Sequence, residues 1–108
     1  MFDFKDHAVL VTGAGAGIGL GIAQAFHQAG ARVALGDLRD AGLKRAAELI
    51  GRSDRVFSKT VDVRDGKSVA EFVQAAEREI GPLTVAVANA GVYPNSPVLD
   101  MTVGSGTA

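Results

Sequence analysis

Short apolar runs alternate along this chain with segments in which apolar residues recur every three or four positions. The runs predict buried strands at residues 8–12, 31–37, 55–63 and 83–91. The segments between them predict amphipathic helices at residues 17–29, 40–50 and 66–80. Each predicted helix is followed by a glycine, at Gly30, Gly51 or Gly81, and Asp65 stands where it would cap the third helix.

The four predicted strands are apolar throughout rather than alternating. That pattern is typical of a parallel sheet that helices cover on both faces. Strands and helices alternate from the first element to the last, which indicates repeated right-handed crossovers. The sequence therefore predicts an α/β fold with an open, doubly wound parallel sheet.

Five glycines stand between residues 13 and 21, where the first strand leads into the first helix. In a doubly wound sheet this turn is a common phosphate site, because glycine lets the backbone approach a pyrophosphate at a helix N-terminus. The alternative is that some glycines only let the helix pack closely on the sheet. We apply that interpretation to Gly21 and in part to Gly19, but it does not account for the whole cluster.

The spacing of these residues narrows the interpretation. Thr12, Gly13, Gly17 and Gly19 follow the pattern T-G-x-x-x-G-x-G, Asp37 ends the second strand, "DV" (62–63) ends the third, and "NAG" (89–91) ends the fourth. Together these motifs resemble the short-chain dehydrogenase/reductase family over roughly residues 5–101. The resemblance implies a Rossmann-like sheet of order 3-2-1-4, with the third helix on the opposite face from the first two, and it stops after the fourth strand.

The resemblance also implies a set of cofactor-binding residues. They are Gly13, Ala16, Gly17, Ile18 and Gly19 at the pyrophosphate and adjoining ribose, Asp37 and Leu38 at the adenosine ribose, Asp62 and Val63 at the adenine, and Asn89, Ala90 and Gly91 beside the cofactor. Asn89 is expected to tie neighbouring strands together as well. Turn or cap roles remain the alternative for Asp37 and Asp62.

The expected cofactor is NAD rather than NADP. A carboxylate at Asp37 accepts hydrogen bonds from ribose hydroxyls and repels a 2′-phosphate. Arg39 lies two residues further on and could offset part of that repulsion.

The family's catalytic serine, tyrosine and lysine all follow the fourth strand. This sequence has one tyrosine, Tyr93, and the residue four positions later is Pro97 rather than lysine. We therefore expect no catalytic residue here. We predict that the chain is a fragment of an NAD(P)-dependent oxidoreductase and that the fragment binds the dinucleotide. An alcohol or ketone would be a substrate only of an intact homologue. The alternatives are an inert dinucleotide-binding module and a non-functional truncated product.

Two segments are predicted, a cofactor-binding half-domain at residues 1–99 and a flexible tail at residues 100–108. From Gly104 the tail departs from the family pattern. A single-base deletion in the gene would produce such a tail, and the alternative is an artificial end with a glycine-serine scar. Without further strands, the fourth strand would be an open apolar edge through which the chain could associate.

Composition removes several classes of function. The net charge is −1, which gives no nucleic-acid footprint, and the chain has no cysteine. His7 and His27 are far apart, so no metal site is expected, and His27 is expected on the surface of the first helix. No apolar run reaches the length of a membrane span, and the expected location is the cytoplasm.

Overall fold

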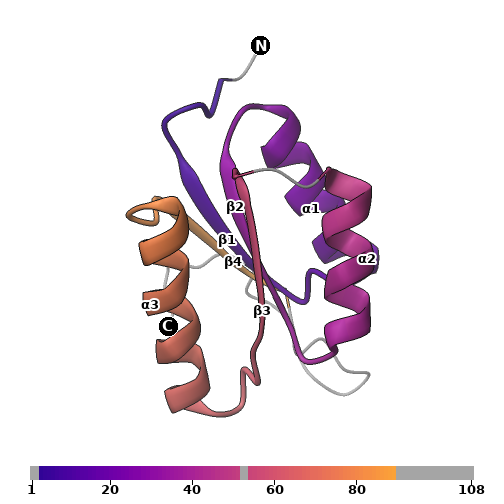
Figure 1. Cartoon of the computed structure of the whole chain (residues 1–108), viewed down its shortest axis with the longest axis vertical. Coiled ribbons are helices and arrows are strands. Elements are labelled where there is room, and N and C mark those ends of the chain that lie inside the picture. The colour runs from indigo at the N-terminus through magenta and orange to yellow at the C-terminus, as the bar shows by residue number, and fades with distance from the viewer. Residues whose placement is uncertain (1–2, 52–53, 90–108) are drawn as a thin grey trace.

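A four-stranded parallel sheet forms the centre of the molecule. The computed structural model describes residues 3–51 and 54–89 (Figure 1). Along the chain the elements are β1 (Ala8–Thr12), α1 (Gly17–Gln28), β2 (Arg32–Asp37), α2 (Asp40–Ile50), β3 (Val56–Thr60), α3 (Gly66–Ile80) and β4 (Val85–Ala88). None of the described helices is long and apolar enough to cross a membrane.

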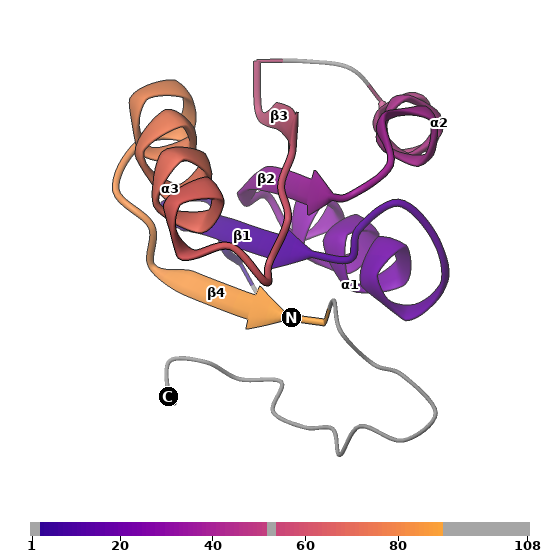
Figure 2. The ribbon, with the colours of Figure 1, turned by 90° about the horizontal axis from the view of Figure 1, so that it is seen from below.

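The strand order is β3-β2-β1-β4, as predicted, and every neighbouring pair is parallel. Helices α1 and α2 cover one face of the sheet and α3 covers the other, so that three layers result (Figure 2). This arrangement confirms the predicted Rossmann-like α/β fold and the predicted switch of the third helix to the opposite face.

Two apolar cores lie on the two faces of the sheet. The core under α1 and α2 is built on the inward-facing residues Val9, Val11, Val33 and Leu35. The core under α3 surrounds the fully buried ring of Phe72. Together they bury all of β1 and the four inner residues of β2.

Strands β3 and β4 are less buried than β1 and β2. Both lie at an edge of the sheet, and their residues alternate between half-buried and exposed along most of their length. They are also shorter than predicted, because a strand continues only as far as its neighbour can pair with it.

Helix ends agree closely with the sequence signals. Helix α2 begins and ends where predicted, and Gly51 and Gly81 follow α2 and α3 with positive φ. The Asp65 carboxylate accepts a hydrogen bond from the Lys67 backbone N–H at 3.0 Å, which is the expected N-cap.

Gly36 in β2 makes room for the core beneath α3. A Cβ atom at this position would lie 2.6 Å from Cε2 of Phe72 and 2.8 Å from a methyl carbon of Val61. The missing side chain therefore lets the Phe72 ring lie directly on the backbone of the central strands.

Candidate functional site

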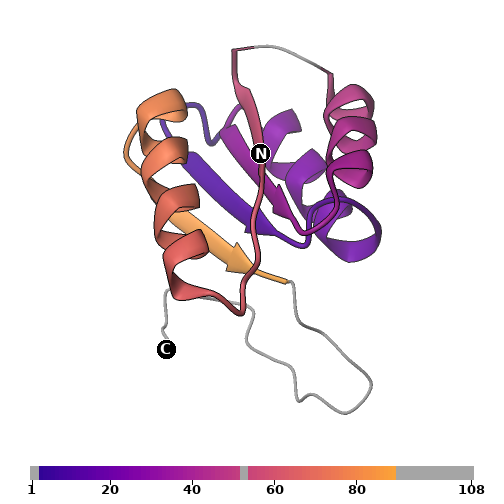
Figure 3. The ribbon, with the colours of Figure 1, turned by 60° about the horizontal axis from the view of Figure 1, so that its bottom comes forward.

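The residues singled out in the sequence converge on the edge of the sheet where the parallel strands end. All four strands run toward the same edge, so the described residues that directly follow them lie there (Figure 3). In open α/β sheets this edge, at the point where strand order reverses, is where ligands bind. Here the reversal lies between β1 and β4, and the glycine loop that follows β1 is therefore at the centre of the edge.

The glycine loop takes backbone conformations that need glycine. Gly13 and Gly17 have φ of 67° and 62°, in the left-handed region that other residues rarely adopt. Ala16 precedes α1 in extended conformation, and its side chain supplies no cap. Within the described residues 3–51 and 54–89, the N–H groups in the first turn of α1 have no side-chain acceptor, which suits an anion at that end of the helix.

Gly19 lies against the strand end and cannot carry a side chain. A Cβ atom there would collide with the carbonyl oxygen of Gly13 and would lie 2.8 Å from Nδ2 of Asn89. Gly21 is different, because a Cβ atom there would meet nothing within 4 Å. The packing interpretation is therefore supported for Gly19 and wrong for Gly21, whose position faces open space.

Asn89 joins the ends of β1 and β4. Its side-chain amide donates a hydrogen bond to the carbonyl oxygen of Gly13 at 3.4 Å, and its backbone N–H donates to Oγ1 of Thr12 at 3.1 Å. The Thr12 hydroxyl in turn donates to the carbonyl oxygen of Val87 at 3.5 Å. The strand-tying part of the prediction for Asn89 agrees with these contacts.

The carboxylate of Asp37 is held beside the glycine loop. Its Oδ2 accepts a hydrogen bond from the Gly15 backbone N–H at 2.8 Å, and its Oδ1 accepts one from the Arg39 N–H at 3.3 Å. Both bonds come from the backbone, and the carboxylate oxygens keep further acceptor capacity for hydroxyl groups.

Gly15 and Gly42 belong to this arrangement and were missed in the sequence. A Cβ atom on Gly15 would lie 2.8 Å from Oδ2 of Asp37 and 3.3 Å from the backbone of Gly42 in α2. The loop and the first turns of α2 thus approach each other closely around Asp37. The glycine cluster in the sequence could have pointed to Gly15, which lies within it. The contact with Gly42 joins two segments that are distant in the sequence, and no local sequence pattern predicts it.

Asp62 is engaged by a neighbour that the sequence did not single out. Its carboxylate accepts hydrogen bonds from the Arg64 side chain at 3.0 and 3.2 Å and from the Arg64 backbone N–H at 3.0 Å. These bonds, the side-chain ones foremost, lower the pKa of Asp62 from its ordinary value. Asp62 is therefore ionised at neutral pH and already paired within its own loop.

Exposed apolar side chains gather at the same edge. Among the described residues, four large apolar side chains are exposed, and three of them follow β1, β2 and β3: Ile18 (71%), Leu38 (57%) and Val63 (37%). The fourth, Leu49, is on α2. Apolar surface that converges beside backbone donors and a carboxylate suits a ligand with both an apolar ring and polar groups. Ala90, Gly91 and Tyr93 lie outside the described residues.

His27 lies near the end of α1, away from this edge, and the expectation that it is a simple surface residue is wrong. Its ring is half-buried, and its Nε2 is buried with no hydrogen-bond partner in the part of the chain that the structure describes. Burial lowers the pKa of His27, and the nearby positive charge of Arg55 lowers it further. His27 is therefore a neutral packing residue at physiological pH.

Known proteins share both this sequence and this fold. Residues 7–105 match the family described as short chain dehydrogenase. The oxidoreductase UcpA of Escherichia coli is 42% identical over 93 residues, which are 86% of this chain and 35% of UcpA. The chain spans about a third of the length of such curated relatives.

Solved structures agree with the sequence match. A short-chain dehydrogenase/reductase (glucose/ribitol dehydrogenase) from Brucella melitensis is 32% identical with a TM-score of 0.82, over 89% of this chain and 40% of its own. The 3-ketoacyl-(acyl-carrier-protein) reductase of the same organism, complexed with NADH, is 32% identical with a TM-score of 0.74, over 79% of this chain and 34% of its own. By sequence and by fold, this chain belongs to the short chain dehydrogenase family.

Proposed function

We propose that this chain binds NAD at the carboxyl edge of its sheet, as the cofactor-binding part of an NAD(P)-dependent oxidoreductase. One observation carries the proposal: the Asp37 carboxylate is fixed by the Gly15 N–H at 2.8 Å, next to a helix N-terminus with no side-chain cap. A dinucleotide needs an anion site for its pyrophosphate and a hydrogen-bond acceptor for its ribose hydroxyls, and the two sites must be close enough for one molecule to reach both.

The pyrophosphate would be held by the glycine loop. Gly13 and Gly17 shape the turn, and the N–H groups of Ile18 and Gly19 start the helix behind Ala16. Because the side chain of Ala16 is small and does not cap the helix, the positive end of the α1 dipole stays available to an anion. The exposed Ile18 side chain would lie beside the same part of the ligand.

The adenosine would lie over the ends of β2 and β3. Asp37 would accept the ribose hydroxyls, with Leu38 beside it, and Val63 would contact the adenine ring. Asp62 would have to share its carboxylate between the adenine amino group and Arg64, which now holds it. Asn89 would keep its strand-tying bonds, and Ala90 and Gly91 would pass beside the nicotinamide half.

The preference for NAD follows from the charge at Asp37. A 2′-phosphate would lie close to this carboxylate and be repelled, and Arg39 offers a partial counter-charge. The contact that the structure gives between Arg39 and Asp37 is the hydrogen bond from the Arg39 backbone N–H.

When bound, the nicotinamide supplies hydride transfer to or from an alcohol or ketone carbon. A proton donor at the substrate oxygen is also required. The single tyrosine of these 108 residues, Tyr93, has Pro97 rather than lysine four positions later. We therefore propose that the chain binds the cofactor without turning over substrate, and that an alcohol or ketone is a substrate only of an intact homologue.

The test is a fluorescence titration of the chain with NADH and with NADPH. We expect NADH to bind more tightly than NADPH, and Asp37→Asn to weaken NADH binding at least about tenfold while improving NADPH, since a lost charged hydrogen bond is worth about 1.5–3 kcal/mol. Asp40→Asn is the matched control, because Asp40 is an exposed carboxylate that pairs only with Lys44 among the contacts the structure gives it. It should bind NADH within twofold of the unchanged chain.

Two assays distinguish the alternatives. NADH formation from NAD and a panel of alcohols should be absent for this chain, and turnover would show that the catalytic part of the proposal is wrong. Absence of any NADH or NADPH binding by the folded chain would favour a non-functional product over a binding module.

A further inference from the structure

The loop that follows β3 holds the backbone of Asp62 in place. The Asp62 N–H donates to Oγ of Ser68 in α3 at 3.0 Å, and the Asp65 N–H donates to the carbonyl oxygen of Asp62 at 3.0 Å. The Val61 N–H donates to the carbonyl oxygen of Asp37 at 2.9 Å, which joins this loop to the end of β2. The backbone on which Asp62 stands is therefore tied both to α3 and to the strand that carries Asp37.

Arg64 fixes the side chain of Asp62. Its Nε donates to Oδ1 of Asp62 at 3.0 Å and its Nη2 donates to Oδ2 at 3.2 Å, so the guanidinium and the carboxylate meet through two parallel hydrogen bonds. The Arg64 backbone N–H also donates to Oδ1, at 3.0 Å. Two donors thus occupy both lone pairs of Oδ1, and a third donor occupies one lone pair of Oδ2. Among the contacts of the described residues, the carboxylate keeps one acceptor position, on Oδ2.

An ordinary ion pair at the surface is the simplest alternative explanation of this contact. The side chains of Asp62 and Arg64 are 35% and 71% exposed. Pairs this exposed contribute little to stability, because water screens both charges. Removal of Arg64 should therefore leave the chain folded. What the arginine does determine is the direction in which the carboxylate points and the number of acceptor positions that it keeps.

We propose that Arg64 is a positioning residue for base recognition, which holds Asp62 so that its Oδ2 receives the amino group of an adenine ring. The inference rests on the proposed cofactor site and adds to it a residue that selects the base. A site built around one hydrogen bond discriminates strongly against a ligand that cannot make it, because the buried polar group is left unpaired. The positive charge of Arg64 also offsets the charge of Asp62 beside a ligand that carries two phosphates.

The orientation of the carboxylate matters because adenine and hypoxanthine offer their donors at different atoms. Adenine donates from its 6-amino group, whereas hypoxanthine has a carbonyl oxygen there and donates from the neighbouring ring nitrogen, N1. A carboxylate that is free to turn can follow the donor from one atom to the other. A carboxylate held by Arg64 cannot turn, and its Oδ2 would face the carbonyl oxygen of hypoxanthine. Arg64 should therefore increase the preference for adenine over hypoxanthine.

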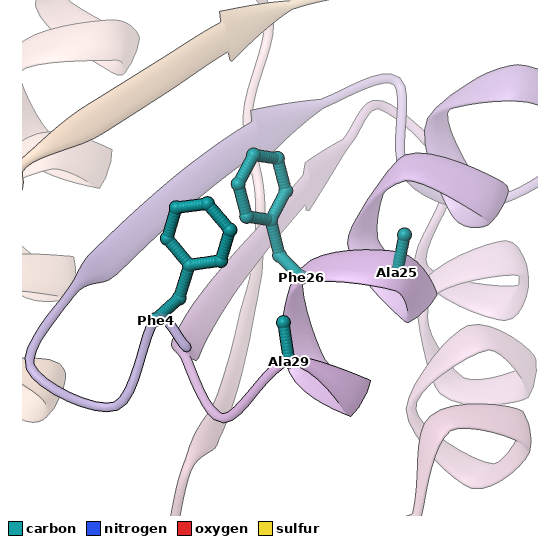
Figure 4. Close-up of a pocket in the computed structure, with 4 residues that line it drawn as sticks. All are labelled: Phe4, Ala25, Phe26 and Ala29. Carbon is teal, nitrogen blue, oxygen red and sulfur yellow. The ribbon is translucent and has the colours of Figure 1, made fainter. Parts of the chain in front are cut away.

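An apolar hollow lies elsewhere on the molecule, near the end of α1. It has a volume of about 290 Å³ and is lined by Phe4, Ala25, Phe26 and Ala29 (Figure 4). A ring could enter this hollow, but none of these four side chains would distinguish an amino group from a carbonyl oxygen. A measured preference for one base over the other therefore reports on Asp62 rather than on binding of the ring in this hollow.

The experiment is a fluorescence titration with NADH and with its hypoxanthine analogue. We expect the unchanged chain to bind NADH at least about tenfold more tightly than the analogue. Arg64→Gln should weaken NADH binding about threefold to tenfold, the scale of ordering one side chain on binding, and should reduce the preference for adenine to below about threefold. Arg64→Lys keeps the charge but cannot make two parallel hydrogen bonds, so it should behave as Arg64→Gln does. Arg78→Gln, which removes an exposed arginine near the end of α3, is the matched control and should equal the unchanged chain.

Further measurements separate positioning from a general effect on the fold. In a chain that already carries Asp62→Asn, Arg64→Gln should leave the NADH affinity unchanged, because the arginine acts through the carboxylate. Without any ligand, Arg64→Gln should raise the pKa of Asp62 toward its ordinary value, since the hydrogen bonds from Arg64 lower it, and NMR of the carboxyl carbon measures this. The melting temperatures of Arg64→Gln and the unchanged chain should agree.

The proposal is overturned if Arg64→Gln keeps the full preference for adenine. It is also overturned if Arg64→Lys keeps that preference, since charge without orientation would then be sufficient, or if Arg64→Gln weakens NADH binding equally in the Asp62→Asn chain. In each of these cases the unchanged chain still binds NADH, so the proposed cofactor site stands. Failure of the folded, unchanged chain to bind NADH would overturn the cofactor site, and this inference would fall with it.

Discussion

Two glycines in the first turns of α1, only two residues apart, have opposite surroundings. Gly19 faces the carbonyl oxygen of Gly13 and the amide of Asn89, with no space for a methyl group. Gly21 faces open space. A glycine cluster in a sequence therefore mixes positions that the site requires with positions that it does not, and only the packing around each one separates them.

Gly19→Ala should destabilise the chain by about 1–3 kcal/mol, because the new methyl group forces the glycine loop off the end of β1. It should also abolish NADH binding. Gly21→Ala is the matched control, and it should stabilise the chain by about 0.5–1 kcal/mol, since alanine restricts the unfolded chain and favours the helix. Urea unfolding measures both, and equal stability of the two variants would contradict the geometry of the loop.

His27 should make stability depend on pH near neutrality. Burial and Arg55 hold the pKa of the folded His27 below the ordinary value of 6.5, so the unfolded chain binds the proton more readily. The stability contribution is therefore present above pH 6.5 and is lost as the pH falls below it.

Urea midpoints between pH 8 and pH 5 test this prediction. The unchanged chain should lose more stability over that interval than His27→Gln, which has no proton to bind. If the stability of His27→Gln changes with pH as much as that of the unchanged chain, burial of the His27 imidazole is not the cause of the pH dependence.

At the scale of single elements, the start of α3 depends on one carboxylate. Asp65→Ala removes the acceptor of the Lys67 N–H and should cost about 1 kcal/mol. Asp40→Ala in the first turn of α2 is the control, since its ion pair with Lys44 is largely exposed and should contribute under about 0.5 kcal/mol. Thermal unfolding compares the two, and an equal loss would mean that Asp65 is not an effective cap.

Helices were predicted from the sequence more accurately than strands, for a physical reason. A helix is closed by residues near to it, such as Asp65 at the start of α3 and Gly51 after α2, and these can be identified along the chain. Strand ends depend on partners. Residues 61–63 were predicted as strand, but β3 ends at Thr60, at the limit of its pairing with β2.

The candidate site was predictable where a motif lies within one turn, and not where two segments meet. The glycine loop followed from the spacing of its residues, whereas Asp37 and Asn89 followed from the family resemblance that their motifs carry. The structure brings these residues to one edge. Three other features depend on side-chain conformation or on tertiary contact. They are the hydrogen bond between Gly15 and Asp37, the approach of Gly42, and the hydrogen bonds from Arg64 to Asp62. No spacing along the chain encodes these.

At the scale of the whole molecule, two edges of the sheet differ in the residues that they present. The carboxyl edge of the strands gathers the glycine loop, Asp37 and the exposed side chains of Leu38 and Val63. The lateral edge at β4 is apolar and bare among the described residues. The chain, which spans about a third of the length of its curated relatives, thus brings the described candidate cofactor residues to one edge.

The central claim is that NADH binds at the carboxyl edge of this chain, and amide hydrogen exchange with and without NADH tests it most directly. We predict slower exchange at residues 13–19 and 37–39, little change in α3 and around Phe4 and Phe26, and loss of the effect in Asp37→Asn. Unchanged exchange at residues 13–19 under saturating NADH, or protection confined to another part of the molecule, would contradict the claim.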